Sequence, residues 1–321
     1  MEGISSRELK IKYLKKLHHT FNKKSFFQFL SNLFCYVILF GVAFLILYPM
    51  LEKVSTIFKS NEDLVDKTVM YIPKEFSLET LRMTIGAMSY SSTLMNTLTF
   101  STVVAIIQVF ICTMISYGFA RFKFPGRKIL FFFVILVLLI PPQVIMSSMY
   151  MTFKEFDFLG VFKALSGKPL NLIDSFWPFI LLSVTGTGLK NSLYIFMMRQ
   201  FFRNMPAELE EAGFIDGAGC FRTYFLIMIP NALPMMLTIF LFSFSWQWSD
   251  GFYTSMFLRE FKVLPNILSS LHTFRLNTLE PVVRTAIVDT GIILVIAPLL
   301  LIYLISQRFF IEGISRSGIV G

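Results

Sequence analysis

Six long apolar stretches constrain this sequence more than any other feature. About 20 apolar residues suffice to cross the hydrocarbon core of a bilayer, and each stretch is close to that length or longer. Charged residues make up only 15% of the 321-residue chain, whereas a soluble domain carries about a quarter. The sequence therefore predicts an all-α fold, a polytopic transmembrane helix bundle with six spans. The expected spans lie near 33–50, 94–120, 129–149, 176–198, 231–249 and 285–306.

Basic residues indicate which side of the membrane each loop faces. The segment before the first span is rich in lysine, and the link 121–128, RFKFPGRK, holds four basic residues and no acid. Lys and Arg accumulate on the cytoplasmic flanks of spans, whereas 51–93 mixes acids and bases as an external loop does. We therefore expect an uncleaved signal anchor and cytoplasmic N- and C-termini.

This orientation divides the chain into four parts. They are a basic cytoplasmic segment over 1–30, the first span with its external loop over 31–93, a core domain of five spans over 94–306, and a cytoplasmic tail over 307–321. The formal net charge of +9 is explained by cytoplasmic flanks, so no nucleic acid partner is expected.

Several of the expected spans contain polar residues. Because a polar group facing lipid is costly, such residues usually face other helices or a water-filled cavity. A lone Ser or Thr that bonds to its own helix is common and needs no special role. The polar residues of these spans are therefore consistent both with helix–helix contacts and with a shared aqueous path. Asp289 stands out, since an ionised carboxylate in hydrocarbon is far more expensive than a hydroxyl. The candidates for a path within the spans are Asn96, Gln143, Asn191 and Asp289.

No catalytic or metal-binding motif occurs in the sequence. It contains no GxSxG elbow, no HExxH helix and no CxxC pair. The stretch GVFKALSGK, residues 160–168, has the wrong spacing for a phosphate-binding loop, and Pro169 follows it. We therefore expect no catalytic residue, metal or cofactor in this chain. Any energy-requiring process would then draw its energy from a partner or an ion gradient.

Residues 206–230, which we call the knob, predict a compact helical turn between two spans. Pro206 suits the first turn of a helix, and the acids up to Glu211 lie near the positive end of its dipole. Asp216 and Gly217 favour a turn, after which an apolar helical segment leads to Pro230 and the next span. Local physics alone also fits an ordinary amphipathic loop.

The spacing within the knob resembles a known motif. The run Glu211-Ala212-Gly213, three residues, Gly217, nine residues and Ile227-Met228-Ile229-Pro230 is similar to the EAA loop of ATP-binding-cassette (ABC) importer permeases. That family has EAA, three residues, G, nine residues and I-x-L-P. Gly213 and Ile229 depart from the pattern, in place of Ala and Leu.

Further similarities point to the binding-protein-dependent, MalG-like carbohydrate subgroup of these permeases. The run YGFARF before Lys123 and the FPGRK that follows it resemble the subgroup's second cytoplasmic link, and Gln307–Gly313 resembles its tail. Trp248-Ser249-Asp250 stands where the subgroup often has Trp-Asn-Asp. The similarities cover most of the chain after about residue 30, with loops 51–93 and 150–175 matching least.

The resemblance implies a type I ABC importer permease fold with a cytoplasmic coupling helix, and transport of a sugar or oligosaccharide. The knob would dock on a cytoplasmic ATPase dimer, which would hold the ATP and Mg²⁺. Glu211 would supply the polar contact, and Gly217 the tight turn or a close approach of the partner. The coupling residues implied in this way are Glu211, Ala212, Gly213, Asp216, Gly217, Ile227 and Pro230.

The resemblance also implies partners in and outside a bacterial cell membrane. A second permease subunit, either a homologous chain or a second copy, would complete the path, and a heterodimer is favoured. A periplasmic or lipid-anchored solute-binding protein would dock on the external loops. Aromatic faces and planar polar groups recognise sugars, although Trp is also common at membrane interfaces. The candidates at the outer end of the fifth span are Trp246, Gln247, Trp248 and Asp250.

Three other functions fit the sequence less well. A permease of the same superfamily could move another solute, such as a peptide or polyamine, although the tail and the FPGRK link argue against it. An ion-gradient-driven secondary transporter would typically show internal repeats and broken helices and needs no ATPase-docking knob. An intramembrane enzyme is disfavoured by the missing catalytic set.

Overall fold

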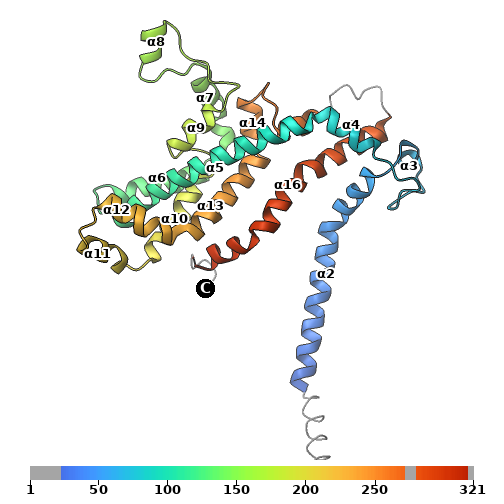
Figure 1. Ribbon diagram of the computed structural model, residues 1–321, viewed down its shortest axis with the longest axis horizontal. Coiled ribbons are helices and arrows are strands. Elements are labelled where there is room, and N and C mark those ends of the chain that lie inside the picture. Colours follow the sequence, from blue (N-terminus) through green and yellow to red (C-terminus); the bar gives the residue numbers. More distant parts are fainter. Residues whose placement is uncertain (1–22, 272–279, 317–321) are drawn as a thin grey trace, which may run out of the picture.

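The chain is built from helices, which confirms the all-α prediction. The computed structural model describes residues 23–271 and 280–316, and side chains for 26–271 and 280–307. No β-strand occurs within the described residues, and Figure 1 shows the helical assembly. The basic residues before Lys23 and the tail beyond Arg316 lie outside the described residues. The helices are α2 Lys23–Ile57, α3 Asn61–Val65, α4 Glu79–Met88, α5 Tyr90–Arg121, α6 Arg127–Leu139, α7 Pro142–Lys154, α8 Val161–Ser166, α9 Trp177–Val184, α10 Asn191–Asn204, α11 Glu208–Ile215, α12 Cys220–Thr223, a π-helical segment Tyr224–Met228, α13 Ile229–Ser249, α14 Phe252–Phe257, α15 Leu264–Ser270 and α16 Pro281–Arg316.

Four uninterrupted helical stretches in the described residues are long and apolar enough to cross a membrane. They lie in α2, in α5, in the continuous helix from α12 through α13, and in α16. The stretch predicted over 129–149 is instead α6 and α7, which meet at a bend of 100°. Pro142 begins α7, and the residue before a proline is disfavoured in the α conformation, so the helix ends there.

The stretch predicted over 176–198 is broken into α9 and α10. The residues between them, TGTGLK over 185–190, hold Gly186 at φ +74° and Lys190 at φ +61°, which is the left-handed region that ends right-handed helices. The structure therefore does not confirm the count of six spans. Its described residues contain four helices long and apolar enough to span, or five if the bent pair of α6 and α7 is one span.

Helix α5 is the centre of the packing. It lies chiefly against α10 and α13, and also against α9. Its residues enter three apolar clusters: Cys112 packs with α10 and α13, Ala105 with α13, α15 and α16, and Phe100 with α7, α9 and α14. In Figure 1, the knob lies near one end of α5, and α3 and α4 lie near the other.

Helix α2 stands apart from this core. Its main packing partner is α16, and most of its apolar side chains are exposed. Figure 1 shows α2 diverging from the other helices away from the end that leads to α3. Near that end, Lys53 of α2 forms an ion pair with Asp289 of α16, so two charges in apolar helices offset each other.

Polar side chains of α5 bind the backbone of the broken pair α9 and α10. The Gln108 amide donates to the Leu189 carbonyl in the break at 3.1 Å, and its oxygen accepts from Ser243 of α13. About two turns further along α5, the Ser116 hydroxyl donates to the Ile195 carbonyl of α10 at 2.9 Å. Since backbone groups in a bilayer must be satisfied within the protein, α5 is what permits the break.

Replacement of Gln108 by leucine tests this dependence. The Leu189 carbonyl and the Ser243 hydroxyl would both lose a buried partner, so we expect Gln108→Leu to lower the free energy of unfolding by about 1–3 kcal/mol. Denaturation of the purified full chain in mixed micelles measures this. Gln143→Leu is the matched control, because Gln143 is exposed on α7. Equal stability of the two variants would contradict the role given to Gln108.

Candidate functional site

The knob is a helix–turn–helix fixed by its own backbone. Helix α11 ends at a left-handed Gly217, with φ +77°. The Ala218 N–H donates to the Gly213 carbonyl at 2.9 Å, and the Gly217 N–H donates to the Phe214 carbonyl at 3.1 Å. This pair of bonds is a Schellman motif, which satisfies the last carbonyls of a helix. The turn predicted at Asp216 and Gly217 is therefore present, with both residues exposed.

The helix after this turn contains a π-helical segment just before Pro230. The Ile229 N–H donates to the Tyr224 carbonyl, five residues back. Pro230 has no N–H, and in a regular α-helix its ring would clash with the carbonyl of Leu226. The wider π turn accommodates that missing bond, so the segment continues into α13 as one helical stretch of 30 residues.

Close packing holds α11 against the π-helical segment. Gly213 is buried, and a Cβ added to it would lie 2.8 Å from the Ile227 Cδ1 and 3.1 Å from the Thr223 Oγ1. The missing side chain lets α11 approach this closely. Gly213 and Ile227, two residues of the motif, thus contact each other rather than facing outward.

Neighbouring glutamates of α11 face opposite ways. Glu210 is buried and forms an ion pair with Arg121 at the end of α5, with 3.3 Å between the Arg121 Nε and the Glu210 Oε2. Arg121 also donates to the Met205 carbonyl at 2.8 Å. Glu211 and Ala212, by contrast, are exposed. The sequence shows three glutamates in one turn and gives no signal for which of them is buried.

The outer surface of the knob is partly apolar. Ile215 is 85% exposed, Phe221 77% and Phe214 50%. These side chains lie on α11 and α12, on either side of the Gly217 turn. Large apolar groups exposed beside an exposed carboxylate are typical of a protein–protein contact surface.

Two of the path candidates, Asn191 and Gln247, lie at or beside the break between α9 and α10. The Asn191 amide donates to the Ser183 carbonyl at 3.3 Å, and Gln247 of α13 lines a small cavity with Ser183, Thr187 and Gly188. The Asn191 Oδ1 and the Gln247 Oε1 are both buried, and neither has a hydrogen-bond partner in the described residues. Buried acceptors of this kind require a donor, so this place suits a bound hydroxyl or water.

A larger pocket of about 350 Å³ lies between the bend of α6 and α7 and the break of α9 and α10. Its polar lining includes Thr187, Lys190 and Tyr253. The Lys190 Nζ also lies 4.6 Å from the ring centroid of Trp246, which is 44% exposed. Lys190 was not a candidate from the sequence, since only the tertiary structure sets it beside Trp246.

The other path candidates have different surroundings. Asn96 donates to the Lys262 carbonyl at 3.1 Å, and the buried Trp248 donates to the Val295 carbonyl at 3.0 Å. Asp289 pairs with Lys53, and Gln143 is exposed on α7 without lining the pocket described above. In these settings the polar groups join helices or face outward.

Asp250 follows α13 and caps the short helix α14. Its carboxylate accepts from the backbone N–H groups of Phe252, Tyr253 and Thr254 at 3.1–3.3 Å. Burial raises the pKa of Asp250 above its usual range, and these three donors oppose the rise. The described residues contain no group of His, Cys, Asp and Glu that could hold a metal ion.

The chain shares its fold with a solved transporter. It superimposes with a TM-score of 0.65 on a chain from the crystal structure of a bacterial ABC transporter involved in the import of the acidic polysaccharide alginate. The match covers 88% of this chain and 96% of the other, at 21% identity. This likeness establishes the permease fold.

Relatives with assigned roles match over nearly the whole chain. The maltodextrin transport system permease protein MdxG of Bacillus subtilis is 25% identical, over 92% of this chain and 98% of its own length. The polygalacturonan/rhamnogalacturonan transport system permease protein YtcP of the same organism is 26% identical, over 91% and 99%. Residues 112–316, more than half of the sequence, match the profile of one family. The chain therefore belongs to the binding-protein-dependent transport system inner membrane components.

Proposed function

We propose that this chain is the permease subunit of an ATP-driven importer for a sugar or oligosaccharide, and that the knob couples it to a separate ATPase. The observation that carries the proposal is the rigid knob with its exposed Glu211 and apolar surface. Several relatives carry carbohydrate transport in their names, which supports the solute class. A peptide or polyamine remains the alternative solute.

The structure offers a mechanical route from the knob to the spans. The ion pair of Arg121 and Glu210 joins α11 to the end of α5, and α5 packs against α10 and α13. A displacement of the knob would therefore move these helices as packed bodies, because helix interfaces shift between discrete arrangements rather than deform. ATP-driven closure of the ATPase dimer would supply that displacement and rock the spans between inward- and outward-facing states.

The pocket beside the break is the proposed solute contact. It combines hydroxyl groups, Lys190 and the aromatic ring of Tyr253, and sugars are bound by such aromatic faces and polar groups. The buried acceptors of Asn191 and Gln247 lie outside the lining of this pocket and would accept from bound water.

The proposed assembly supplies what one chain lacks. An ATPase dimer presents two docking sites, and this chain has one knob, so a second permease subunit is expected. ATP and Mg²⁺ would bind to the ATPase. An external solute-binding protein would deliver the sugar to the face opposite the knob, and the knob and both termini would lie in the cytoplasm.

Substitution of Gly217 tests the coupling. A β-branched residue at φ +77° is strained by about 1–3 kcal/mol, so Gly217→Val would distort the turn while the spans stay inserted. We expect ATP hydrolysis by the full complex in proteoliposomes to lose its link to uptake. Gly219→Val is the matched control, because Gly219 has φ −71° and open space around it. Normal uptake by the Gly217 variant would overturn the coupling role.

Charge reversal at Glu211 tests the docking surface. Because its side chain is exposed, Glu211→Lys should leave the thermal stability of the chain unchanged and reduce retention of the ATPase subunit at least tenfold on purification of the complex. Glu210→Gln, by contrast, is expected to lower the thermal stability of the chain, because it removes the buried charged partner of Arg121. Retention unaffected by Glu211→Lys would contradict the assignment.

A further inference from the structure

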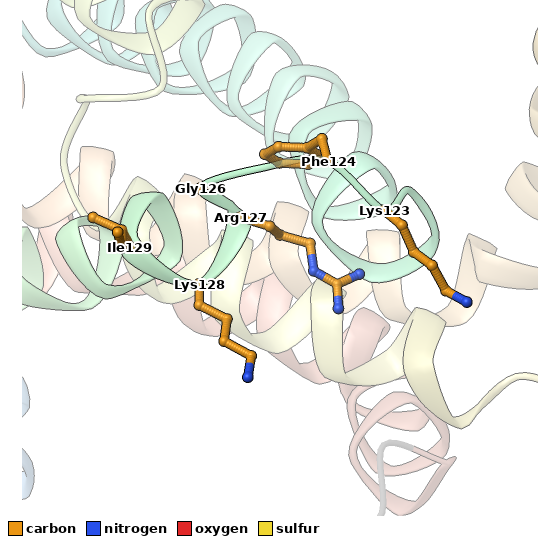
Figure 2. A pocket seen from close by; sticks show the side chains of 6 residues that line it. All are labelled: Lys123, Phe124, Gly126, Arg127, Lys128 and Ile129. Carbon is orange, nitrogen blue, oxygen red and sulfur yellow. The ribbon is translucent and has the colours of Figure 1, made fainter.

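A cluster of basic side chains lies at the link between α5 and α6 and has no part in the coupling described above. Lys123, Arg127 and Lys128 line an open pocket of about 420 Å³ with Phe124, Gly126 and Ile129. Figure 2 shows the three basic side chains directed to the same side of this link. Arg127 and Lys128 also line a second pocket, of about 350 Å³, with Arg199 and Arg203 of α10. We call these five basic residues the basic pocket.

Among the side chains that the structure describes, no carboxylate balances the basic pocket. Acidic residues are absent from the lining of both cavities, and the ion pairs formed among the described residues do not involve these five. Burial, and after it the neighbouring charges of Arg203 and Arg127, lower the pKa of Arg199. This repulsion within the chain would be relieved by an anion from outside it.

The backbone adds to the positive potential. Arg127 and Lys128 occupy the first turn of α6, a helix of 13 residues with no acid in that turn. The N-terminus of a helix carries partial positive charge, so cations are disfavoured there and an anion is favoured. Arg199 is held in place by its contact with the Phe131 ring, 3.9 Å from the centroid, and by the Phe119 carbonyl.

An exposed apolar surface continues from the basic pocket along α6. Ile129 is 62% exposed, Phe132 60% and Phe133 51%. A ligand that joins a phosphate to hydrocarbon chains would match both parts, whereas a free phosphate would use only the first. Basic pockets at the ends of spans bind anionic lipid head groups in this way.

We propose that the basic pocket binds the phosphate of an anionic phospholipid, whose acyl chains lie along α6. The guanidinium groups of Arg127, Arg199 and Arg203 would bind the phosphate oxygens, and Lys123 and Lys128 would add charge at the rim. This site is separate from the knob and does not rest on the proposed coupling. It would make the seating of α6 against α10 sensitive to the lipid composition of the membrane.

The test compares lipids that differ in charge. The full chain is reconstituted in bilayers, and the fraction of immobilised spin-labelled lipid is measured by electron paramagnetic resonance for phosphatidylglycerol and for phosphatidylcholine. We expect a several-fold preference for phosphatidylglycerol. One lysine near a membrane surface contributes roughly a fivefold change in affinity, so Lys123→Gln/Lys128→Gln should markedly reduce the preference.

A matched variant controls for charge alone. Lys163→Gln/Lys168→Gln removes the same charge from two exposed lysines in and just after α8, and should keep the preference. Lys123 and Lys128 are both exposed, so the test variant should fold. Arg203→Gln, also exposed, provides a second test and should weaken the preference as well.

Three results would overturn the proposal. The first is a preference that is absent, or that falls equally in the test and control variants. The second is loss of the preference on addition of inorganic phosphate but not of sodium chloride at the same ionic strength, which would indicate a site for free phosphate. The third is loss of the preference when the ATPase is bound, which would indicate that the basic pocket contacts that protein.

Discussion

The fold depends on satisfying the backbone of a helix that is broken within an apolar stretch. Unpaired N–H and C=O groups cannot remain in a bilayer core, and the break over 185–190 creates several of them. Gln108 of α5 binds the Leu189 carbonyl and is itself bound by Ser243 of α13. Two helices and the break thus meet at one amide. Gly188 makes this possible, because a Cβ there would lie 2.9 Å from the Gln108 Nε2.

The same helix connects this break to the knob. One end of α5 carries Arg121, which pairs with Glu210 of α11. Between the break and the knob, Ser116 binds the backbone of α10, and Tyr117 packs against Phe202 and Tyr224. Small polar residues at helix interfaces in membranes allow close approach and hydrogen bonding. A single packed helix therefore links the knob, our proposed docking surface for an ATPase, with the polar cavity at the break.

Local sequence patterns predicted the elements better than their contacts. The apolar runs located four spanning helices, and Asp216-Gly217 located the turn of the knob, because both depend on nearby residues. The run over 176–198 was predicted as one span, although its Gly186 and Gly188 are breaking residues. Asp289 was a path candidate because a lone carboxylate is costly in a membrane. Its partner Lys53 lies 236 residues away, so the sequence pattern did not show the pair.

The sequence by itself determined that the chain is a helical membrane protein, where its long helices lie, and the spacing of the knob that indicated its family. These properties follow from composition and short-range geometry. Only the tertiary structure decided that Glu210 turns inward and Glu211 outward, that Gln247 of α13 lines a cavity beside the break, and that five basic residues converge at one end of α6. The residue type sets the free-energy cost of burying a polar group. Packing between distant segments decides which group becomes its hydrogen-bond partner, as for Gln108 and Leu189, which are 81 residues apart.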